Sequence, residues 1–495
     1  MTAADRHASR NGACFTASVP FDPDILRNPL RREAIAVLHV SRLQLTRLQP
    51  AALLLVLGFA LTSCTEVPEE VPAISRVSDL AQLAPGWTGE VVAQVPQSYA
   101  GWDVEIGDAD GDGCPEILTG SAPDSRIYQF RKRDGVWDSR TLLDSAAGDR
   151  GGMVLGVRIV DLDHDGVPEI IAGTGQDDDS IARLHLMHTD GERLTQQRMI
   201  QSPENTSSYT HGLATADLDG DGVDEIVSAY CGHGEVIRYD VAPQTLVPSA
   251  RKVLQLGNSG EDAILADVDG DGRVELIVSS SFRDDAARIE IHDLDPATGD
   301  PIATPRLVID QYDGHPAFYA SLLVGDLDGD GAPELIVGWK AKQDENRASL
   351  LAYRIRGASA EVAYVLSHED QDLDLGYFEK MMAIADLDGD GRPELVVSTR
   401  GDGLSEGIPS AHLGHVFRYF VSPDGEVRRE LVLDFDQDLA ESAWLAVGDA
   451  DGDGRPDLVL ATGKGDRTAS GTSWVLSLTR SDARGDVIGP CRPAG

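Results

Sequence analysis

The chain has 495 residues, 41% of them hydrophobic, and its 83 acidic residues outnumber 42 Lys and Arg, which gives a formal net charge of −41. Such a negative surface argues against nucleic acid and anionic membranes as partners, because both carry the same sign of charge. The length alone would allow several domains, but the repeat described below indicates one closed central unit.

The first 63 residues are predicted to be a leader that the mature protein lacks. The leader would consist of an N-terminal stretch that results from a translation start assigned too far upstream, followed by a signal peptide. The apolar run Pro50–Ser63 is too short to span a bilayer and has the form of a signal-peptide core. It ends in Leu61-Thr62-Ser63-Cys64, which resembles a bacterial lipobox and implies lipidation of Cys64. An ordinary secretory signal is the alternative. Both interpretations predict export, to the cell envelope or surface as a lipoprotein or otherwise as a secreted protein.

The segment 64–85 contains several Pro and Glu residues and is predicted to be a flexible tether. The repeat unit described below is predicted over residues 86–480, followed by a tail over 481–495. Cys114, Cys231 and Cys491 are far apart and odd in number, which argues against a disulfide framework.

Seven copies of one acidic nonapeptide occur in the central part of the chain. They read DADGDGCPE, DLDHDGVPE, DLDGDGVDE, DVDGDGRVE, DLDGDGAPE, DLDGDGRPE and DADGDGRPD, with a carboxylate at positions 1, 3, 5 and 9 and a glycine at position 6. They begin at Asp108, Asp161, Asp217, Asp267, Asp326, Asp386 and Asp449. Seven copies at intervals of 50 to 63 residues indicate a repeat fold.

Four carboxylates on one turn repel one another, each close pair by roughly 4 kcal/mol at 4 Å and an effective dielectric near 20. The turn is therefore predicted to need a counter-ion. Oxygen ligands without His or Cys side chains favour a hard cation, and their number favours calcium over magnesium, with up to seven ions. Glycine at position 6 permits the sharp turn.

The predicted ligands are the side chains at positions 1, 3, 5 and 9 and the backbone carbonyl at position 7. In chain order they are Asp108, Asp110, Asp112, Cys114 and Glu116; Asp161, Asp163, Asp165, Val167 and Glu169; Asp217, Asp219, Asp221, Val223 and Glu225; Asp267, Asp269, Asp271, Arg273 and Glu275; Asp326, Asp328, Asp330, Ala332 and Glu334; Asp386, Asp388, Asp390, Arg392 and Glu394; and Asp449, Asp451, Asp453, Arg455 and Asp457.

The loops have two other interpretations. An EF-hand requires a bidentate Glu at position 12. That position here is Thr119, Ala172, Ser228, Val278, Val337, Val397 or Leu460, so the EF-hand interpretation fails in all seven copies. Plain polar hairpin turns are the remaining alternative, which the number of copies makes the weaker one.

Each loop lies between two short apolar segments that predict buried strands, such as Val154–Val160 and Glu169–Ala172. A third and a fourth strand follow, for example at Arg288–His292 and Arg306–Ile309. Four strands in about 50 to 60 residues make one blade, so we predict an all-β, seven-bladed β-propeller with a calcium loop between strands 1 and 2 of each blade. Glu90–Val95 is predicted to complete the last blade and so to remove an open sheet edge.

The loops, with a following aliphatic pair such as Ile117-Leu118, resemble the FG-GAP/VCBS repeats of integrin-α-type propellers from about Gly86 to Leu478. The resemblance implies calcium loops on the lower face, which brace the blades, and partners on the upper face. Literal Phe-Gly and Gly-Ala-Pro signatures are not evident, which favours the VCBS-like branch.

Residues just before strand 1 and just after strand 2 of each repeat should meet on the face opposite the loops. Aromatic side chains with polar and cationic neighbours there suit a glycan or protein ligand. The candidates are Trp102, His211, Tyr230, His233, Tyr319, Trp339, Lys380 and Trp444. The alternative is that the aromatic residues plug the axial channel or cover the blade ends.

No nucleophile elbow, zincin motif, phosphate loop or spaced Cys/His set is found, so no catalytic residue is predicted. The leading hypothesis is an exported, surface-anchored calcium-binding scaffold for a glycan or protein ligand, which contacts the membrane only through a lipid on Cys64. One alternative is a carbohydrate-active enzyme of the lyase or dehydratase type, with its site opposite the calcium loops and His211 and His233 as acid or base. A structural envelope component is the other.

Overall fold

The computed structural model describes the chain from Arg76 to Ala483 with gaps. The described residues are 76–95, 99–122, 124–144, 153–175, 182–201, 209–281, 287–312, 314, 316–340, 348–370, 373, 380–399, 414–422, 424–435, 442–463 and 473–483. The predicted leader, Cys64 and most of the tail lie outside them. Within these ranges, no helix has both the length and the apolar character needed to cross a membrane.

Antiparallel pairing groups the described strands into seven successive units of four. Units one to three are β3 (Tyr99–Gly107), β4 (Glu116–Ala122), β5 (Arg126–Arg133), β6 (Val136–Asp144); β7 (Met153–Val160), β8 (Glu169–Gly175), β9 (Arg183–Thr189), β10 (Leu194–Gln201); β11 (Tyr209–Ala216), β12 (Glu225–Cys231), β13 (Glu235–Ala242), β14 (Val247–Gln255). Units four and five are β15 (Ser259–Ala266), β16 (Glu275–Ser281), β17 (Arg288–His292), β18 (Leu307–Ile309); β19 (Tyr319–Gly325), β20 (Glu334–Lys340), β21 (Ala348–Arg356), β22 (Ser359–Asp370). Units six and seven are β23 (Met382–Ala385), β24 (Glu394–Ser398), β25 (His415–Val421), β26 (Val427–Asp434); β27 (Ser442–Gly448), β28 (Asp457–Gly463), β29 (Ser473–Arg480), β2 (Trp87–Val95).

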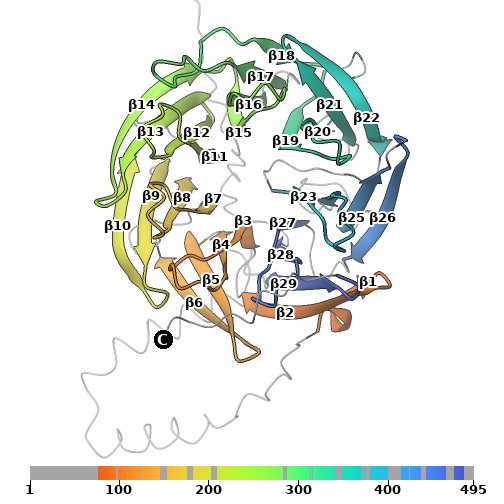
Figure 1. Cartoon of the computed structure of the whole chain (residues 1–495). Helices are drawn as coiled ribbons and strands as arrows, with labels where there is room; N and C mark the ends of the chain where they lie inside the picture. Colours follow the sequence, from red (N-terminus) through yellow and green to blue (C-terminus); the bar gives the residue numbers. More distant parts are fainter. Residues whose placement is uncertain are drawn as a thin grey trace, which may run out of the picture. The chain divides into compact units, whose positions relative to one another are not determined.

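The units stand in a ring around a central axis, with the first strand of each unit innermost and the fourth at the rim (Figure 1). The fold is a β-propeller, as predicted. The ring closes because β2 pairs with β29 over its whole length, from Trp87 opposite Arg480 to Val95 opposite Ser473. The N-terminal strand therefore completes the last unit, as expected, and covers the outer edge of β29.

Residues 76–85, which the sequence assigned to the flexible tether, are instead packed against the propeller. A 3-10 turn, η2 (Val77–Asp79), places the fully buried Val77 in the apolar core between units six and seven. The short strand β1 (Gln82–Leu83) then pairs with the outer strand β26. The apolar side chains of this segment gain more from burial than its backbone loses in freedom, so the prediction was wrong for these residues.

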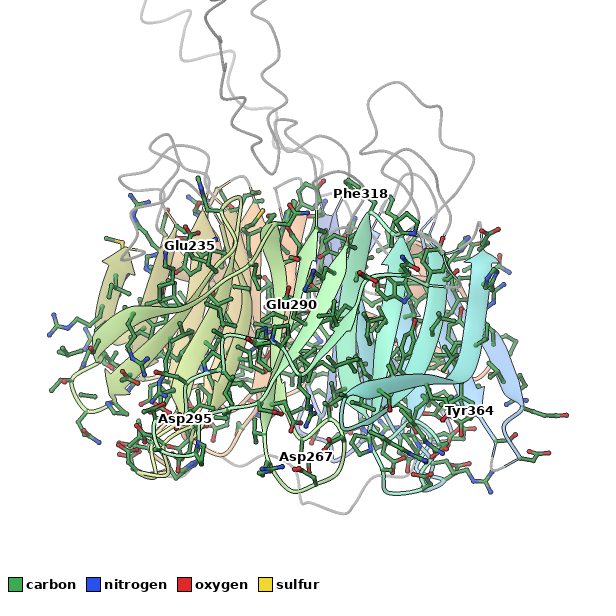
Figure 2. The ribbon with its side chains drawn as sticks, turned by 90° about the horizontal axis from the view of Figure 1, so that it is seen from above. Glu235, Asp267, Glu290, Asp295, Phe318 and Tyr364 are labelled. Atoms are coloured by element: carbon green, nitrogen blue, oxygen red, sulfur yellow. The ribbon has the colours of Figure 1, made fainter. Side chains whose placement is uncertain are left out.

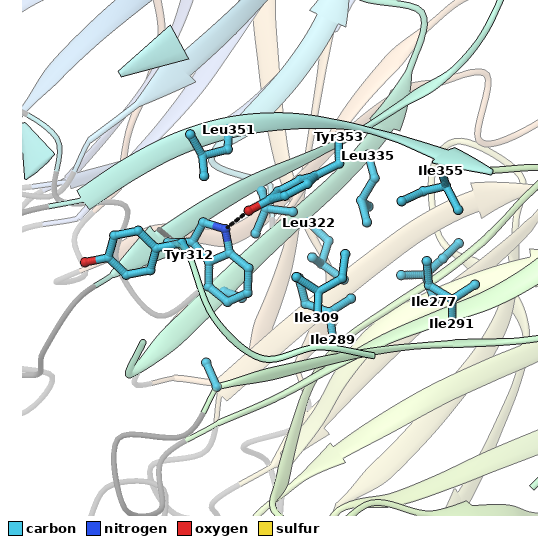
Figure 3. Packing of buried hydrophobic residues seen from close by; sticks show 14 of the residues in the cluster. Ile277, Ile289, Ile291, Ile309, Tyr312, Leu322, Leu335, Leu351, Tyr353 and Ile355 are labelled. Atoms are coloured by element: carbon cyan, nitrogen blue, oxygen red, sulfur yellow. Dashed lines mark hydrogen bonds between the residues drawn. The ribbon is translucent and has the colours of Figure 1, made fainter. Parts of the chain in front are cut away.

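Burial falls from the second strand of each unit toward the rim. β8, β12, β16, β20 and β28 are buried at every residue, which fits their β-branched and aliphatic composition. Outer strands are more exposed: in β6 every residue except the buried Leu142 and Leu143 is exposed or half-buried. The apolar core lies between neighbouring units, as Figure 3 shows for units four and five, where Ile277, Ile289 and Leu335 pack together.

The first strands are irregular near the end opposite the loops. The pairing register shifts between Tyr99 and Asp103 in β3, between His211 and Leu213 in β11, and between Gly260 and Asp262 in β15. β-bulges of this kind re-aim the side chains that follow them. Asp103 and Asp262, which follow two of these shifts, contribute to the axial network described below.

Cys114 and Cys231 each take part in a disulfide bond. The expectation that the cysteines form no disulfide was therefore wrong at these two positions. Separation along the sequence is a poor guide here, because a disulfide requires only that two Cα atoms come within about 7 Å in space, and a closed ring brings remote segments together.

Candidate metal loops and the axial cavity

The acidic loops join the first and second strands at one edge of the ring. Figure 2 shows Asp267, the first residue of the fourth loop, at this edge, and Glu235 and Phe318 at the opposite edge. Antiparallel neighbours place all seven loops at the same end, because every loop makes the same turn from an inner strand to the next one outward.

Each loop is held by the same two hydrogen bonds from its own backbone. The position 9 carboxylate accepts the N–H of position 2 at 2.8–3.1 Å, and the position 1 carboxylate accepts the N–H of position 6 at 2.7–3.0 Å. The position 9 side chains are at most 3% exposed. The acidic residues therefore have a structural task in the turn and still leave other oxygens for a ligand.

The loop backbone is left-handed at two positions. Position 6 is glycine in all seven copies, with φ between 83° and 88°. Position 4 is glycine in six copies, and His164 takes the same left-handed conformation in the second, with φ 56°. Residues other than glycine rarely adopt such φ angles, which explains why glycine recurs in the motif.

The carboxylates converge closely enough to hold a cation. In at least five loops, one oxygen from each of three acidic residues lies within 4.8 Å of the other two, as for Asp108, Asp110 and Glu116. In loops two, four and six, the position 3 oxygen Oδ1 of Asp163, Asp269 or Asp388 is buried and has no hydrogen-bond donor. Buried carboxylate oxygens without a donor are costly unless a cation serves them. The donor set fits a hard cation.

The sequence matches the FG-GAP-like repeat over residues 108–172 and 217–278 and the FG-GAP repeat over residues 443–476. The chain is of the FG-GAP repeat β-propeller type. No match was found among curated proteins. Among solved structures, the exotype rhamnogalacturonan lyase YesX is similar with a TM-score of 0.43 and 16% sequence identity, over 82% of this chain and 75% of that one. So distant a likeness says nothing of this protein's function.

Most FG-GAP loops contact a cationic side chain that the sequence analysis missed. Arg131 of β5 pairs with Asp110 and Glu116, both at 3.2 Å, and also with Asp112. The equivalent contacts come from Arg238, Arg306, Arg354 and Arg418 in loops three to six and from His188 in loop two. Part of the repulsion within the loops is therefore relieved by the protein itself.

The seventh loop differs, because the third strand of its unit offers a hydroxyl instead of a cation. Thr479 donates to Asp457 at 2.5 Å, and the cationic contact comes from the neighbouring unit, where Lys132 lies 3.0 Å from Asp451. A basic residue recurring in the third strand was the available signal for these contacts except that of Arg306, which directly precedes the fourth strand β18. It follows position 9 at variable distances, because the hairpins differ in length, so only the strand pairing aligns it.

Burial and mutual repulsion raise the pKa values of the position 9 acids. Burial, with Asp110 and Asp112 nearby, raises the pKa of Glu116 to about 8. Burial likewise raises the pKa values of Glu225, Glu394 and Asp457 to about 7. A cation at the loop would favour the charged carboxylates, so metal binding and proton release should be coupled.

Replacing Asp217, Asp219 and Asp221 together by Asn should remove one bound cation per chain and loosen one unit without unfolding the ring. Only the third loop loses its charged ligands, and neighbouring units keep their own. Calcium stoichiometry by elemental analysis and calorimetry would measure the loss. A matched control replaces the exposed residues Asp138, Glu192 and Glu361 by their amides; an equal loss of calcium there would show that the loops are not the sites.

The candidate residues on the face opposite the loops are mostly inside the protein. Trp102 and Trp444 are buried and stack with centroids 5.4 Å apart, with Tyr99 against both rings. Tyr230 is buried and its hydroxyl contacts that of Tyr239.

The remaining candidates divide between core and surface. Trp339 is buried and its Nε1 donates to Tyr353 at 3.0 Å (Figure 3), and Tyr319 is buried too. His233 is exposed. The backbone of His211 lies in β11 opposite Ala229, while its side chain lies outside the described part of the chain.

Lys380 reaches across the axis from unit six to unit one. Its Nζ lies 3.0 Å from Asp103 Oδ1, contacts the Glu105 carboxylate and donates to the Val104 carbonyl at 3.1 Å. Arg158 of unit two lies 2.7 Å from the other Asp103 oxygen. The ion pairs thus join three units at the centre of the ring.

The network borders an axial cavity of about 500 Å³, which is lined by residues from the first strand of every unit. Lys380 and Arg158 contribute cations to this wall, and Glu105 and Asp262 contribute acids. Burial raises the pKa of Asp262 to about 7. The cavity is therefore a mixed apolar and charged space whose described cations are already paired with acids.

Proposed function

We propose that this protein is an exported, calcium-loaded FG-GAP propeller that acts as a rigid binding scaffold for a glycan or protein ligand. The observation that carries the proposal is the convergence of acidic side chains in the repeated loops, with partnerless buried oxygens on Asp163, Asp269 and Asp388. Oxygen-only sites of this kind suit calcium.

Calcium would be held by the carboxylates at positions 1, 3, 5 and 9 of each loop, with the position 7 carbonyl. When bound, the ion would neutralise the acids that fix the turn between the first two strands. Calcium sites of extracellular modules typically have Kd values of about 10⁻⁴ to 10⁻³ M, which suits an exported protein. Export and anchoring through Cys64 remain part of the proposal, on the strength of the signal-like run that precedes that residue.

A scaffold role is supported by the way the described charges are used. Lys380, Arg158 and Asp103 are engaged with one another at the axis, and the aromatic candidates pack in the core. Both features stiffen the ring, and a pre-organised surface lowers the entropic cost of binding.

The test is a screen of the purified full chain, less its leader, against glycan and protein arrays, with calcium at 5 mM and again with a chelator. We expect calcium-dependent binding of at least one ligand class, because the loops order the blade ends. Binding that is indifferent to calcium, or turnover of a sugar substrate in place of stable binding, would refute the scaffold proposal.

A further inference from the structure

A second cavity, of about 610 Å³, lies beside the sixth FG-GAP loop. Its lining combines loop residues such as Asp388 and Glu394 with residues of β25 and β26 and with Arg480 at the end of β29. The cavity therefore opens at the loop end of the ring, where units six and seven meet. Its volume is in the range of small-ligand sites.

Arginines of this cavity stack on Phe420, which lines it, and on the nearby Trp87. The Arg418 and Arg428 guanidinium groups lie on Phe420 at 4.3 and 4.5 Å from its centroid. Arg418 and Arg480 lie over Trp87 at 6.0 and 5.6 Å. Cation–π contacts hold guanidinium groups in place without using their N–H donors. Asp482 accepts from Arg480, and Glu430 pairs with the Nη2 atoms of Arg418 and Arg428, so the other donors of Arg418 and Arg428 are the ones available to an anion.

Arg418 is poorly satisfied by its own loop. Its side chain is only 4% exposed, its Nη1 lies 3.3 Å from Asp388 and 3.4 Å from Glu394, and its Nε has no acceptor. Its one short contact is outside the loop, where Nη2 donates to Glu430 of β26 at 2.9 Å. The counterpart in the fifth loop, Arg354, makes contacts of 2.6 to 2.9 Å to three loop acids. A buried guanidinium N–H without an acceptor is an unsatisfied donor, and a ligand oxygen would satisfy it.

Calcium would change the charge of this wall. The lining holds four arginines and five acidic residues, a balance of one negative charge, and a divalent ion on the sixth loop would make it one positive charge. The ion would also draw Asp388 and Glu394 away from the long contacts with Arg418. Arg418 would keep Glu430 on its Nη2, and its Nη1 and Nε would then remain for an external anion.

We propose that this cavity is a calcium-dependent site for the carboxylate of a short acidic saccharide, bound by Arg418 and Arg428. This inference deepens the proposed function and rests on calcium binding to the sixth loop. By linkage, the saccharide should in turn tighten calcium binding there by the same factor.

The remaining acids of the cavity favour a sugar acid over an acidic peptide. Glu426 also lines the cavity, where it can accept hydrogen bonds from hydroxyl groups. Glu430, which pairs with Arg418 and Arg428, repels further carboxylates. A ligand with one carboxylate and several hydroxyls fits both demands. The net charge of −41 repels long polyanions, whereas a short ligand feels mainly charges within a Debye length of about 8 Å at physiological salt.

The experiment is calorimetric titration of the calcium-loaded full chain with cellobiouronic acid, a disaccharide with one carboxylate. Cellobiose is the neutral match, and an octapeptide rich in Glu is the peptide arm. We expect binding of the acid only, at least tenfold weaker with chelator and weaker at 0.5 M than at 0.05 M salt. The acid should also lower the calcium concentration needed for half-saturation.

Two variants test the arginines. Arg418→Met should weaken the acid at least tenfold, and Arg428→Gln, at a 67% exposed side chain that the fold does not need, should weaken it at least threefold. The matched control is Arg133→Gln, an exposed arginine at the rim of unit one, which should change nothing.

Three results would overturn the inference: acid binding that ignores the chelator, Arg428→Gln binding like the unmodified chain, or tighter binding of the peptide than of the disaccharide. Absence of acid binding while calcium binds normally would also overturn it and leave the scaffold proposal standing. Absence of calcium binding itself would refute both the scaffold proposal and the saccharide site.

Discussion

Removing calcium should lower the melting temperature of the propeller by on the order of 10 °C or more. Calcium at 10 to 100 times its Kd stabilises the folded state by about 1.4 to 2.7 kcal/mol per site, because the unfolded chain does not gather the four carboxylates. Seven loops repeat the same donor pattern, and the units share their apolar cores, so the contributions should add within one cooperative transition. Differential scanning calorimetry with calcium, magnesium and chelator would measure the shift.

The pH dependence of the chelated protein provides an independent check of the same loops. Glu116 has a folded pKa of about 8, and Glu225, Glu394 and Asp457 of about 7, all above their ordinary values of 3.8 to 4.5. Between those limits the folded state binds more protons than the unfolded state, so stability falls as pH rises. The chelated protein should melt lower at pH 8 than at pH 5.

Calcium should stabilise most at the higher pH, because it binds the ionised carboxylates. The triple variant of the third loop, with Asn for Asp217, Asp219 and Asp221, serves as the internal control, since it should lose about one seventh of the calcium effect. A melting temperature that is indifferent to calcium, or one that rises from pH 5 to pH 8 in chelator, would contradict the assignment of the loops.

The second large effect is expected at the axis. Lys380→Met should destabilise the propeller by about 3 kcal/mol, because breaking one side of a buried ion pair leaves a charge without its partner. Asp103 is 1% exposed and would keep Arg158 and the backbone N–H groups of Val104 and Val157, while Glu105 would lose the contact with Lys380 Nζ. Urea unfolding at constant calcium would measure the change. Methionine keeps the apolar length of the side chain, so the charge is the main difference.

Lys252→Met is the matched control, since Lys252 lies on an exposed outer strand position and its loss should cost less than about 0.5 kcal/mol. Glu105→Gln in the Lys380→Met background should recover part of the stability, because it removes the stranded charge. Equal effects of the two lysine variants would show that the network does not bind the units together.

Individual strands show how closely the bounds predicted from the sequence match those in the structure. The third strand of unit four was predicted as Arg288–His292 and has those bounds, and the fourth differs by one residue. The closing strand was predicted from Glu90 and begins at Trp87. Apolar segments bounded by turns carry this information locally, because a strand buried on both faces needs a run of β-branched and aliphatic residues.

The loops were predictable for the same reason. Each is a nine-residue motif whose acids, glycines and hydrogen bonds lie within one turn, so no distant residue was needed to recognise them. Loop position, ring closure and the choice of an all-β fold followed from the motif and its period. The chain by itself determined these features because the interactions behind them span few residues.

Tertiary structure alone decided which distant side chains contact the loops and the inner strands. Arg131 and Arg418 reach their loops through strand pairing across hairpins of different length, and Lys380 meets Asp103 across 277 positions of sequence. Packing of residues 76–85 and the cavity beside the sixth loop likewise depend on closure between units six and seven. Such contacts join segments that no periodicity relates, so they exist only once the ring has formed.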